Sequence, residues 1–366
     1  MLRKFIFSSE GLIQFLANIA MFSVITYVPL WGREIGLNDS EIALVATLYG
    51  IIAFASGIIT GKLSDLYGAR KIFIIAGLGV GAITLVGMAI PDKLGFIIFR
   101  VFSGIGLGMF TPALIALVSD KGNKLGNFSS RGALGWSVGI LTSGIIGLFW
   151  VPAIFLYSAL SLLAALLVAF TLTEDKATKK YKESLLSVFW ERKKVYIAFG
   201  LRHSFAAALW TLWALFLAEL GADTFWIAVI SFVNAFTQTI LMRRVTDRLN
   251  CQKMVAGGLL LTGICFILYT VPSSFIGIIP LQVILGASFA FLYVGTLRYS
   301  IEKSSFDKST AAGLLQSTQN FSFIMGAIIA LIITSLGGSY LEIIWISAIA
   351  NFITFAGFVL FEKIAS

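Results

Sequence analysis

Residues 61–71 carry the sequence GKLSDLYGARK, and residues 243–253 carry a related charged segment, RRVTDRLNCQK. Asp65 of the first segment and Asp247 of the second lie 182 residues apart, close to half of the 366-residue chain. Each segment separates two long apolar stretches. A short charged connection that occurs twice between long apolar stretches predicts a membrane protein built from two related halves.

The composition of the chain is that of a membrane protein. Hydrophobic residues make up 58% and charged residues 12%, which is far from the composition of a soluble domain. A helix of about 20 apolar residues crosses the roughly 30 Å of hydrocarbon in a bilayer. The pattern predicts an all-α membrane protein with twelve transmembrane helices, at residues 6–31, 41–60, 71–90, 94–118, 128–149, 151–172, 195–218, 224–242, 254–272, 275–298, 311–334 and 340–361.

The basic residues set the expected topology. The net charge of +9 suggests a nucleic-acid partner at first sight, but the distribution of the charges argues against one. With the N-terminus inside, the predicted cytoplasmic segments hold 23 of the 27 Lys and Arg residues, and the predicted outer loops hold only Arg33 and Lys93. This asymmetry follows the positive-inside rule, so both termini are expected on the cytoplasmic side of a cell membrane. The expected anionic partner is the lipid bilayer.

The repeat continues beyond the charged segments. Residues 42–43 match residues 227–228 at an offset of 185, and a three-residue deletion in the eighth predicted helix changes the offset to 182. At the second offset Arg100 meets Gln282. One register held through whole helices predicts two pseudo-symmetric six-helix bundles, 1–172 and 195–366, joined by a polar cytoplasmic linker, 173–194.

The first charged segment resembles the signature that the major facilitator superfamily carries between its second and third helices. That signature reads Gly-x-Leu-small-Asp-Arg-x-Gly-Arg-Lys, and two of its usual arginines are replaced here by Leu66 and Ala69. Residues 100–104, RVFSG, resemble the second motif of the superfamily, and Asp120 closes the same helix, as it often does in members. The resemblance covers the whole chain and implies a twelve-helix transporter of the drug-efflux-like branch. The matching residues of the signature are Gly61, Leu63, Ser64, Asp65, Gly68 and Arg70, followed by Lys71.

The resemblance implies that this segment forms a gate. Asp65 would contact the start of the eleventh helix near Thr310, and Arg70 and Asp120 would complete a charge network that holds the inner gate closed. The alternative is that Asp65 only caps its own turn. Glycines 61 and 68 are expected to allow a tight turn between two helices. The expected gating residues are Gly61, Asp65, Gly68, Arg70, Lys71, Asp120 and, as a weaker second copy, Asp247.

Ionisable residues inside predicted helices are costly in lipid, which makes each of them a functional candidate. The four candidates for proton coupling are Glu10, Arg100, Arg202 and His203. Glu10 lies about two turns from Lys4, so contact with cytoplasmic water is an equally weighted alternative to a role in proton coupling. For Arg100 the alternative role is packing between helices. His203 titrates near neutral pH when unperturbed, although a satisfied buried histidine is the commoner case. Arg202 and His203 are neighbours on a helix, about 100° apart, so we expect them to face different directions.

Polar side chains also recur along single helix faces, where they can hydrogen-bond a solute or a facing helix. Aromatic residues nearby can form cavity walls, although they also pack between helices or against lipid. The candidates for substrate binding are Gln14, Asn18, Asn234, Gln238, Gln316, Gln319 and Asn320, with Trp136, Trp210, Phe289 and Tyr293 as apolar walls.

Glycine pairs spaced four residues apart predict close helix contacts. Three such pairs lie inside predicted helices. They are Gly77 with Gly81, Gly104 with Gly108, and Gly135 with Gly139.

The resemblance implies a secondary transporter of a small organic solute that works by alternating access, coupled to protons or another ion, as a monomer without cofactor or metal. Export is the default direction. However, Ile140 follows Gly139 where the antiporter motif has a Gly-Pro pair, and two intramembrane arginines against one glutamate favour an anionic solute. Uptake or exchange of an organic anion or sugar is therefore the alternative, and a transporter-like receptor is the third. One histidine, no metal cluster and no nucleophile–base pair argue against an enzyme.

Overall fold

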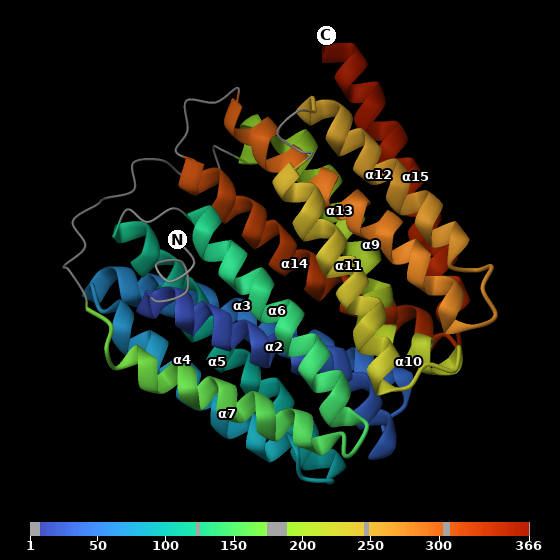
Figure 1. The fold of residues 1–366 in the computed structure, drawn as a ribbon. Helices are drawn as coiled ribbons and strands as arrows, with labels where there is room; N and C mark the ends of the chain where they lie inside the picture. The colour runs from blue at the N-terminus through green and yellow to red at the C-terminus, as the bar shows by residue number, and fades with distance from the viewer. Residues whose placement is uncertain (1–7, 122–124, 174–188, 245–248, 303–307, 366) are drawn as a thin grey trace. The chain divides into compact units, whose positions relative to one another are not determined.

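The structure is a computed structural model that describes residues 8–121, 125–173, 189–244, 249–302 and 308–365. Helices fill these ranges, and no β-strand occurs within them (Figure 1). The helices in the N-terminal part are α2 (Ser9–Glu34), α3 (Asp39–Tyr67), α4 (Arg70–Met88), α5 (Lys93–Asp120), α6 (Leu125–Gly147) and α7 (Pro152–Ala169). Those that follow are α9 (Lys193–Thr211), α10 (Trp213–Glu219), α11 (Thr224–Arg244), α12 (Cys251–Leu268), the 3₁₀ helix η2 (Phe275–Gly277), α13 (Ile278–Glu302), α14 (Lys308–Ser335) and α15 (Tyr340–Ala365).

The helices have the length and composition of membrane spans. Ten helices in the described residues are long and apolar enough to cross a membrane, and α9 with α10, bent by 52° at Leu212, would make an eleventh. The bent pair occupies the predicted segment 195–218, and α6 occupies the predicted segment 128–149. Glycines, serines and Arg131 interrupt the apolar sequence of α6 and lower its hydropathy. The predicted class, an all-α multi-pass membrane protein, is confirmed.

The chain packs as two compact units. The first unit contains Met1–Lys180 and Asp223–Val229, and the second contains Tyr181–Ala222 and Ile230–Ser366. The first turns of α11 therefore group with the first unit. There the Tyr27 hydroxyl donates a hydrogen bond to the carbonyl oxygen of Thr224, at 2.7 Å.

The two units repeat the same helix packing. In the first unit α2 packs against α6 and α7, and α4 packs against α5 and α7. In the second unit α9 packs against α14 and α15, and α12 packs against α13 and α15. These are counterpart helices in the register of the sequence repeat. The duplicated sequence thus folds into a duplicated set of helix contacts.

Glycines allow a close helix crossing in each unit, between α4 and α5 in the first and between α12 and α13 in the second. A Cβ atom added at Gly77 of α4 would lie 2.7 Å from the carbonyl oxygen of Gly106 on α5. A Cβ added at Gly258 of α12 would lie 2.7 Å from the carbonyl oxygen of Ser288 on α13, and residues 106 and 288 are related by the offset of 182. Small residues allow such close backbone approach between membrane helices, so the same crossing occurs once in each unit.

A second pair of crossings follows the same rule. A Cβ at Gly104 would lie 2.6 Å from the carbonyl oxygen of Tyr49, and a Cβ at Gly286 would lie 2.8 Å from that of Asn234. Tyr49 and Asn234 are related by the offset of 185. The close helix contacts predicted for the glycine pairs are confirmed, since the remaining members Gly81, Gly108, Gly135 and Gly139 also have neighbouring atoms where a Cβ would lie.

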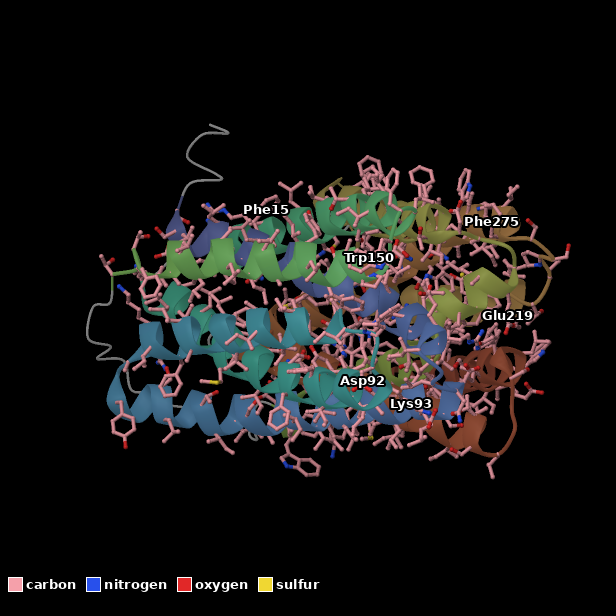
Figure 2. All side chains as sticks on the ribbon, turned by 90° about the horizontal axis from the view of Figure 1, so that it is seen from below. Phe15, Asp92, Lys93, Trp150, Glu219 and Phe275 are labelled. Atoms are coloured by element: carbon pink, nitrogen blue, oxygen red, sulfur yellow. The ribbon has the colours of Figure 1, made fainter. Side chains whose placement is uncertain are left out.

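Ion pairs hold one end of the first unit. Arg33 at the end of α2 pairs with Asp39 at 2.5 Å, and Lys93 at the start of α5, marked in Figure 2, pairs with Glu41 at 2.8 Å. Glu41 also accepts a hydrogen bond from the backbone N–H of Asn38, whose side chain caps α3 in return. These polar groups join the ends of α2, α3 and α5 at one end of the unit, where the helices stop being apolar.

Candidate functional site

The predicted gate segment is mostly helical. Helix α3 continues through Gly61 to Tyr67, so the predicted turn at Gly61 is wrong. One glycine costs a helix only about 1 kcal/mol, which does not end it. Gly68 makes the turn with a φ of 61°, a left-handed conformation that glycine adopts without steric cost. The side chains of Asp65 and Asp120, and the whole of Asp247, lie outside the described residues.

Arg70 and Lys71 anchor the first gate segment to its own unit. Arg70 is buried, and its Nη1 donates to Ser64 Oγ at 3.0 Å. Lys71 Nζ donates to the carbonyl oxygens of Phe170 and Leu172, at 2.7 and 2.8 Å, just beyond the last residue of α7. An ammonium group at the end of a helix satisfies carbonyls that lack partners within the helix and complements the negative end of the dipole. The segment therefore links the ends of α3, α4 and α7.

The second copy of the segment uses a different local structure. Asn250 takes the place of Gly68 in the repeat, and its side chain accepts a hydrogen bond from the backbone N–H of Lys253 at 3.1 Å. Asn250 is thus the N-cap of α12, a role for which its short polar side chain is well suited. Glycine ends a helix in the first copy, whereas asparagine starts one in the second.

Glu10 forms an ion pair within the first unit. Its Oε1 lies 2.6 Å from Nζ of Lys121 at the end of α5, and both side chains are largely buried. Lys121 Nζ also donates to Thr173 Oγ1 at 3.3 Å. The ion pair joins the start of α2 to the end of α5, and it gives Glu10 a structural partner in addition to the roles expected from the sequence.

The other two members of the α2 polar stripe lie against α6. Asn18 Nδ2 donates to the carbonyl oxygen of Gln14 at 2.8 Å. A Cβ added at Gly132 of α6 would lie 2.9 Å from Gln14 Nε2 and 3.3 Å from Asn18 Nδ2. Gln14 and Asn18 thus occupy the α2–α6 contact, which corresponds to the facing-helix alternative for these residues.

Replacing Lys121 with methionine is expected to destabilise the protein by about 1–3 kcal/mol, because it leaves the carboxylate of Glu10 buried without its partner. The double replacement Glu10→Gln with Lys121→Met removes both charges and should recover most of that loss. Thermal unfolding of the purified protein in detergent measures both effects. Equal losses in the single and double variants would show that the unpaired carboxylate of Glu10 does not cause the loss.

Arg100 stacks on a ring in the first unit. Its Cζ lies 3.7 Å from the centroid of the Tyr49 ring, a cation–π contact between α5 and α3. In the second unit the counterpart residues Gln282 and Asn234 form a hydrogen bond of 3.1 Å. The same helix contact is therefore made by a cation on a ring in one unit and by two amides in the other, which favours packing as the role of Arg100.

A chain of hydrogen bonds extends from that amide pair. Gln238 Nε2 donates to Asn234 Oδ1 at 2.5 Å, Asn234 Nδ2 donates to Gln282 Oε1 at 3.1 Å, and Gln282 Nε2 donates to Tyr269 Oη at 2.7 Å. The chain connects α11, α13 and α12 in the second unit. Asn234 and Gln238, expected as substrate ligands, thus bond to protein side chains in this structure.

Arg202 is a fully buried cation in the second unit. Its Nε donates to Thr262 Oγ1 at 2.9 Å and its Nη2 to Ser288 Oγ at 3.1 Å, and these two hydroxyls lie 2.9 Å apart. Its Nη1 is buried without a hydrogen-bond partner, and no ion pair in the described part of the chain includes Arg202. A buried charge without a counter-charge is expensive, which makes Arg202 the strongest functional candidate.

His203 lies among aromatic rings. Its ring centroid is 5.4 Å from that of Phe199, which it stacks on, 5.2 Å from Trp210, 5.7 Å from Phe289 and 5.0 Å from Phe323. The side chain is buried, and neither ring nitrogen has a hydrogen-bond partner among the described residues. The imidazole is thus packed by aromatic rings, with no hydrogen bond from a described residue.

Arg202 and His203 converge on the same rings. The Cζ of Arg202 lies 5.6 Å from the ring centroid of Trp210 and 5.6 Å from that of Phe289, the rings that also contact His203. The two neighbours thus share two rings, although Arg202 bonds to α12 and α13 whereas His203 also contacts Phe323 of α14. Helical spacing fixes where the Cβ atoms point, but the long arginine side chain bends toward the broad Trp210 ring two turns further along α9. We call Arg202, His203, Trp210, Phe289 and Phe323 the Arg202–His203 site.

The remaining predicted residues are placed as follows. Tyr293 stacks on Phe289 at 5.6 Å and borders the Arg202–His203 site. Trp136 belongs to the first unit, where it stacks on Phe22 at 4.5 Å. On α14, Gln319 is half-buried and Asn320 is exposed, and the side chain of Gln316 lies outside the described residues. The structure thus brings together Arg202, His203, Trp210, Phe289 and Tyr293 from the predicted set.

Three residues of this region were not predicted from the sequence. Thr262 and Ser288 supply the hydroxyls that bond Arg202, and Phe323 covers His203. Most hydroxyls in these helices bond the backbone of their own helix, as Thr318 and Thr334 do, so the sequence does not distinguish the two that bond a cation. One sequence feature does point to Ser288. At the repeat offset of 182 it corresponds to Gly106, which lies in a close helix contact.

Comparison with known proteins identifies the class. The profile of the Major Facilitator Superfamily matches residues 11–227, more than half of the chain. The protein therefore belongs to this superfamily of membrane transporters, and it is not an enzyme.

Related sequences match part of the chain. An uncharacterized MFS-type transporter of Methanocaldococcus jannaschii is 28% identical over 166 residues, which are 43% of either chain. The multi-drug resistance efflux pump PmrA of Streptococcus pneumoniae is 30% identical over 174 residues, 44% of this chain and 43% of the pump. The matches thus span less than half of these relatives. The crystal structure of nucleoside transporter NupG shares the fold over 97% of this chain and 98% of that one, with a TM-score of 0.80 and 15% identity.

Proposed function

We propose that this protein is a secondary active transporter that moves a small organic solute across the membrane by alternating access. In that mechanism two similar bundles move about a solute site near the middle of the bilayer. The observation that carries the proposal is the duplicated helix packing of the two units, with the α4–α5 crossing at Gly77 matched by the α12–α13 crossing at Gly258. Membership of the superfamily supports the same function.

The proposed arrangement has twelve spans in two six-helix bundles, 1–172 and 195–366, joined by the linker 173–194. Helix α6 would be the twelfth span. Its polar residues make it less apolar than the helices that already have the length and composition of spans. The distribution of Lys and Arg supports a cytoplasmic location for both termini. We take the transporting species to be a monomer, because each half repeats the packing of the other.

Export is the leading direction, supported by the similarity to an efflux pump. One observation favours a second candidate, the uptake or exchange of an organic anion. Arg202 is buried, keeps one donor without a partner and has no carboxylate partner in the described residues. An anionic solute would supply the missing charge.

Replacing Asp65 with asparagine is expected to lower transport about three- to tenfold, because about 0.7–1.4 kcal/mol of charge interaction with a helix terminus is lost at the gate. Folding should be unchanged, since the residue lies at the end of α3. Initial rates of solute flux in proteoliposomes measure the effect, and thermal unfolding checks the fold. Asp247→Asn is the matched control in the second copy and should have a smaller effect. Full transport by Asp65→Asn would rule out the gate.

His203 is the proposed proton carrier, because the ring nitrogens are without partners whereas Glu10 is paired with Lys121. His203→Gln is expected to abolish uphill flux driven by a pH gradient and to preserve exchange of solute across the membrane. Proteoliposomes with and without the gradient, tested against a broad solute panel, measure both. Uphill flux that persists makes His203 structural. A wild type that moves no solute under any ion gradient counts against transport itself, and in favour of a receptor.

A further inference from the structure

The Arg202–His203 site has the charge of an anion receptor. Nη1 of Arg202 carries two N–H groups, and it has no partner although the guanidinium is completely buried. Nε and Nη2 are already occupied by Thr262 and Ser288. The protein therefore holds the guanidinium at Nε and Nη2, and Nη1 can donate a hydrogen bond to one oxygen of a carboxylate. A charge-assisted bond of this kind is among the strong hydrogen bonds.

The surroundings of that donor are aromatic. The rings of Trp210 and Phe289 lie 5.6 Å from the Arg202 guanidinium carbon, and Tyr293 stacks on Phe289 at 5.6 Å. Aromatic rings prefer other rings as offset or edge-on neighbours. A small inorganic anion would leave these faces unused, and a cation would be repelled by Arg202. The combination of one unbonded guanidinium nitrogen and several rings fits a flat apolar body with a single negative group.

The site has a partly exposed cover. Phe323 of α14 lies edge-on to His203 at 5.0 Å and 6.3 Å from Trp210, yet 37% of its surface is exposed. Arg202 and His203 beneath are 0% and 1% exposed. Rotation of the Phe323 side chain would remove its contacts with His203 and Trp210, and a bound aromatic ring would take over those contacts.

We propose that the Arg202–His203 site binds a small aromatic monocarboxylate, with the carboxylate on Nη1 of Arg202 and the ring against Trp210, Phe289 and Phe323. This ligand is the solute class of the transporter proposed above, and the inference rests on that proposal. All the protein groups that it uses lie in the second unit, on α9, α12, α13 and α14.

Thermal unfolding of the purified full-length protein with three matched ligands tests the inference. A ligand that binds the folded state raises the melting temperature as its concentration passes its Kd. Benzoate should stabilise the protein. Cyclohexanecarboxylate has the same charge on a saturated ring and should bind more weakly. Benzamide keeps the ring without the charge and should have no effect.

Two variants locate the binding. Arg202→Met should weaken benzoate binding at least about tenfold, the effect of losing one charge-assisted hydrogen bond. Phe323→Leu keeps an apolar side chain and should reduce the preference for benzoate over cyclohexanecarboxylate, so it tests the site independently of Arg202. Unchanged benzoate binding in Arg202→Met, or an equal response of the wild type to all three ligands or to none, overturns the inference.

Flux measurements separate this inference from the proposed function. If the protein transports other solutes but does not bind benzoate, only the proposal of an aromatic carboxylate as the solute is contradicted. The protein could instead bind benzoate, lose that binding in Arg202→Met, and move neither benzoate nor any other solute. That result would support the binding site and contradict the transport function.

Discussion

Replacement of Arg202 with methionine is expected to abolish transport and at the same time to stabilise the protein by about 1–4 kcal/mol, the range seen when buried ion pairs give way to apolar residues of similar size. The guanidinium is fully buried with one donor unused. Methionine fills the same length of space without a charge. The two hydroxyls left behind keep their partners, because Thr262 donates to the carbonyl oxygen of Gly258 at 2.8 Å and lies 2.9 Å from Ser288.

The two readouts separate function from structure. Thermal unfolding in detergent measures the stability, and flux in proteoliposomes, with a solute that the wild type carries, measures transport. Arg202→Lys is the control that retains the charge but loses the planar fork of donors, and it should not be stabilised. A lower melting temperature for Arg202→Met, with a matching loss of flux, would make Arg202 a structural residue and contradict the prediction.

Alanine at Gly77 or at Gly258 is expected to destabilise the protein by about 1–3 kcal/mol, the usual cost of forcing an extra group into a packed contact. In each case the new Cβ would lie 2.7 Å from a backbone carbonyl oxygen of the partner helix, and a backbone atom cannot rotate away. The two helices must separate, or the crossing must shift.

The chain supplies a matched control for each site. Gly79 lies on α4, two residues after Gly77, and Gly257 lies next to Gly258 on α12, and neither has an atom within 4 Å of an added Cβ. Alanine at either control position should be neutral or slightly stabilising, since alanine is the better helix former. Thermal unfolding compares the four variants. Equal stability within each pair would mean that the glycines do not hold the crossings.

The helical class of the fold and its close contacts could be predicted from the sequence. Apolar runs of about 20 residues leave little alternative to membrane helices, and the glycine pairs at Gly77 and Gly104 marked real crossings because only small residues allow backbones to approach. The repeat register also relates Gly104 to Gly286, and each of these glycines lies against the backbone of its unit's neighbouring helix.

The candidate site was predicted only in part, since long side chains do not follow helix spacing alone. Arg202 and His203 were both recognised as candidates, but their convergence on Trp210 depends on how the guanidinium bends between neighbouring helices. The partner of Glu10 was missed for the same reason, because Lys121 reaches it from a helix end 111 residues away. Gly61 was misread as a turn residue because the family signature carries a glycine there.

The inclusion of residues 223–229 in the first unit has a consequence for how the protein is made. The first unit contains Met1–Lys180 together with Asp223–Val229, where the Thr224 carbonyl accepts the hydrogen bond of Tyr27. At ribosomal rates of about 5–20 residues per second, the stretch from Lys180 to Val229 takes roughly 2–10 s to synthesise. During that interval the partly built unit waits in the bilayer while α9 and α10 emerge. A nascent chain released before residue 224 would therefore lack the hydrogen bond between Tyr27 and Thr224.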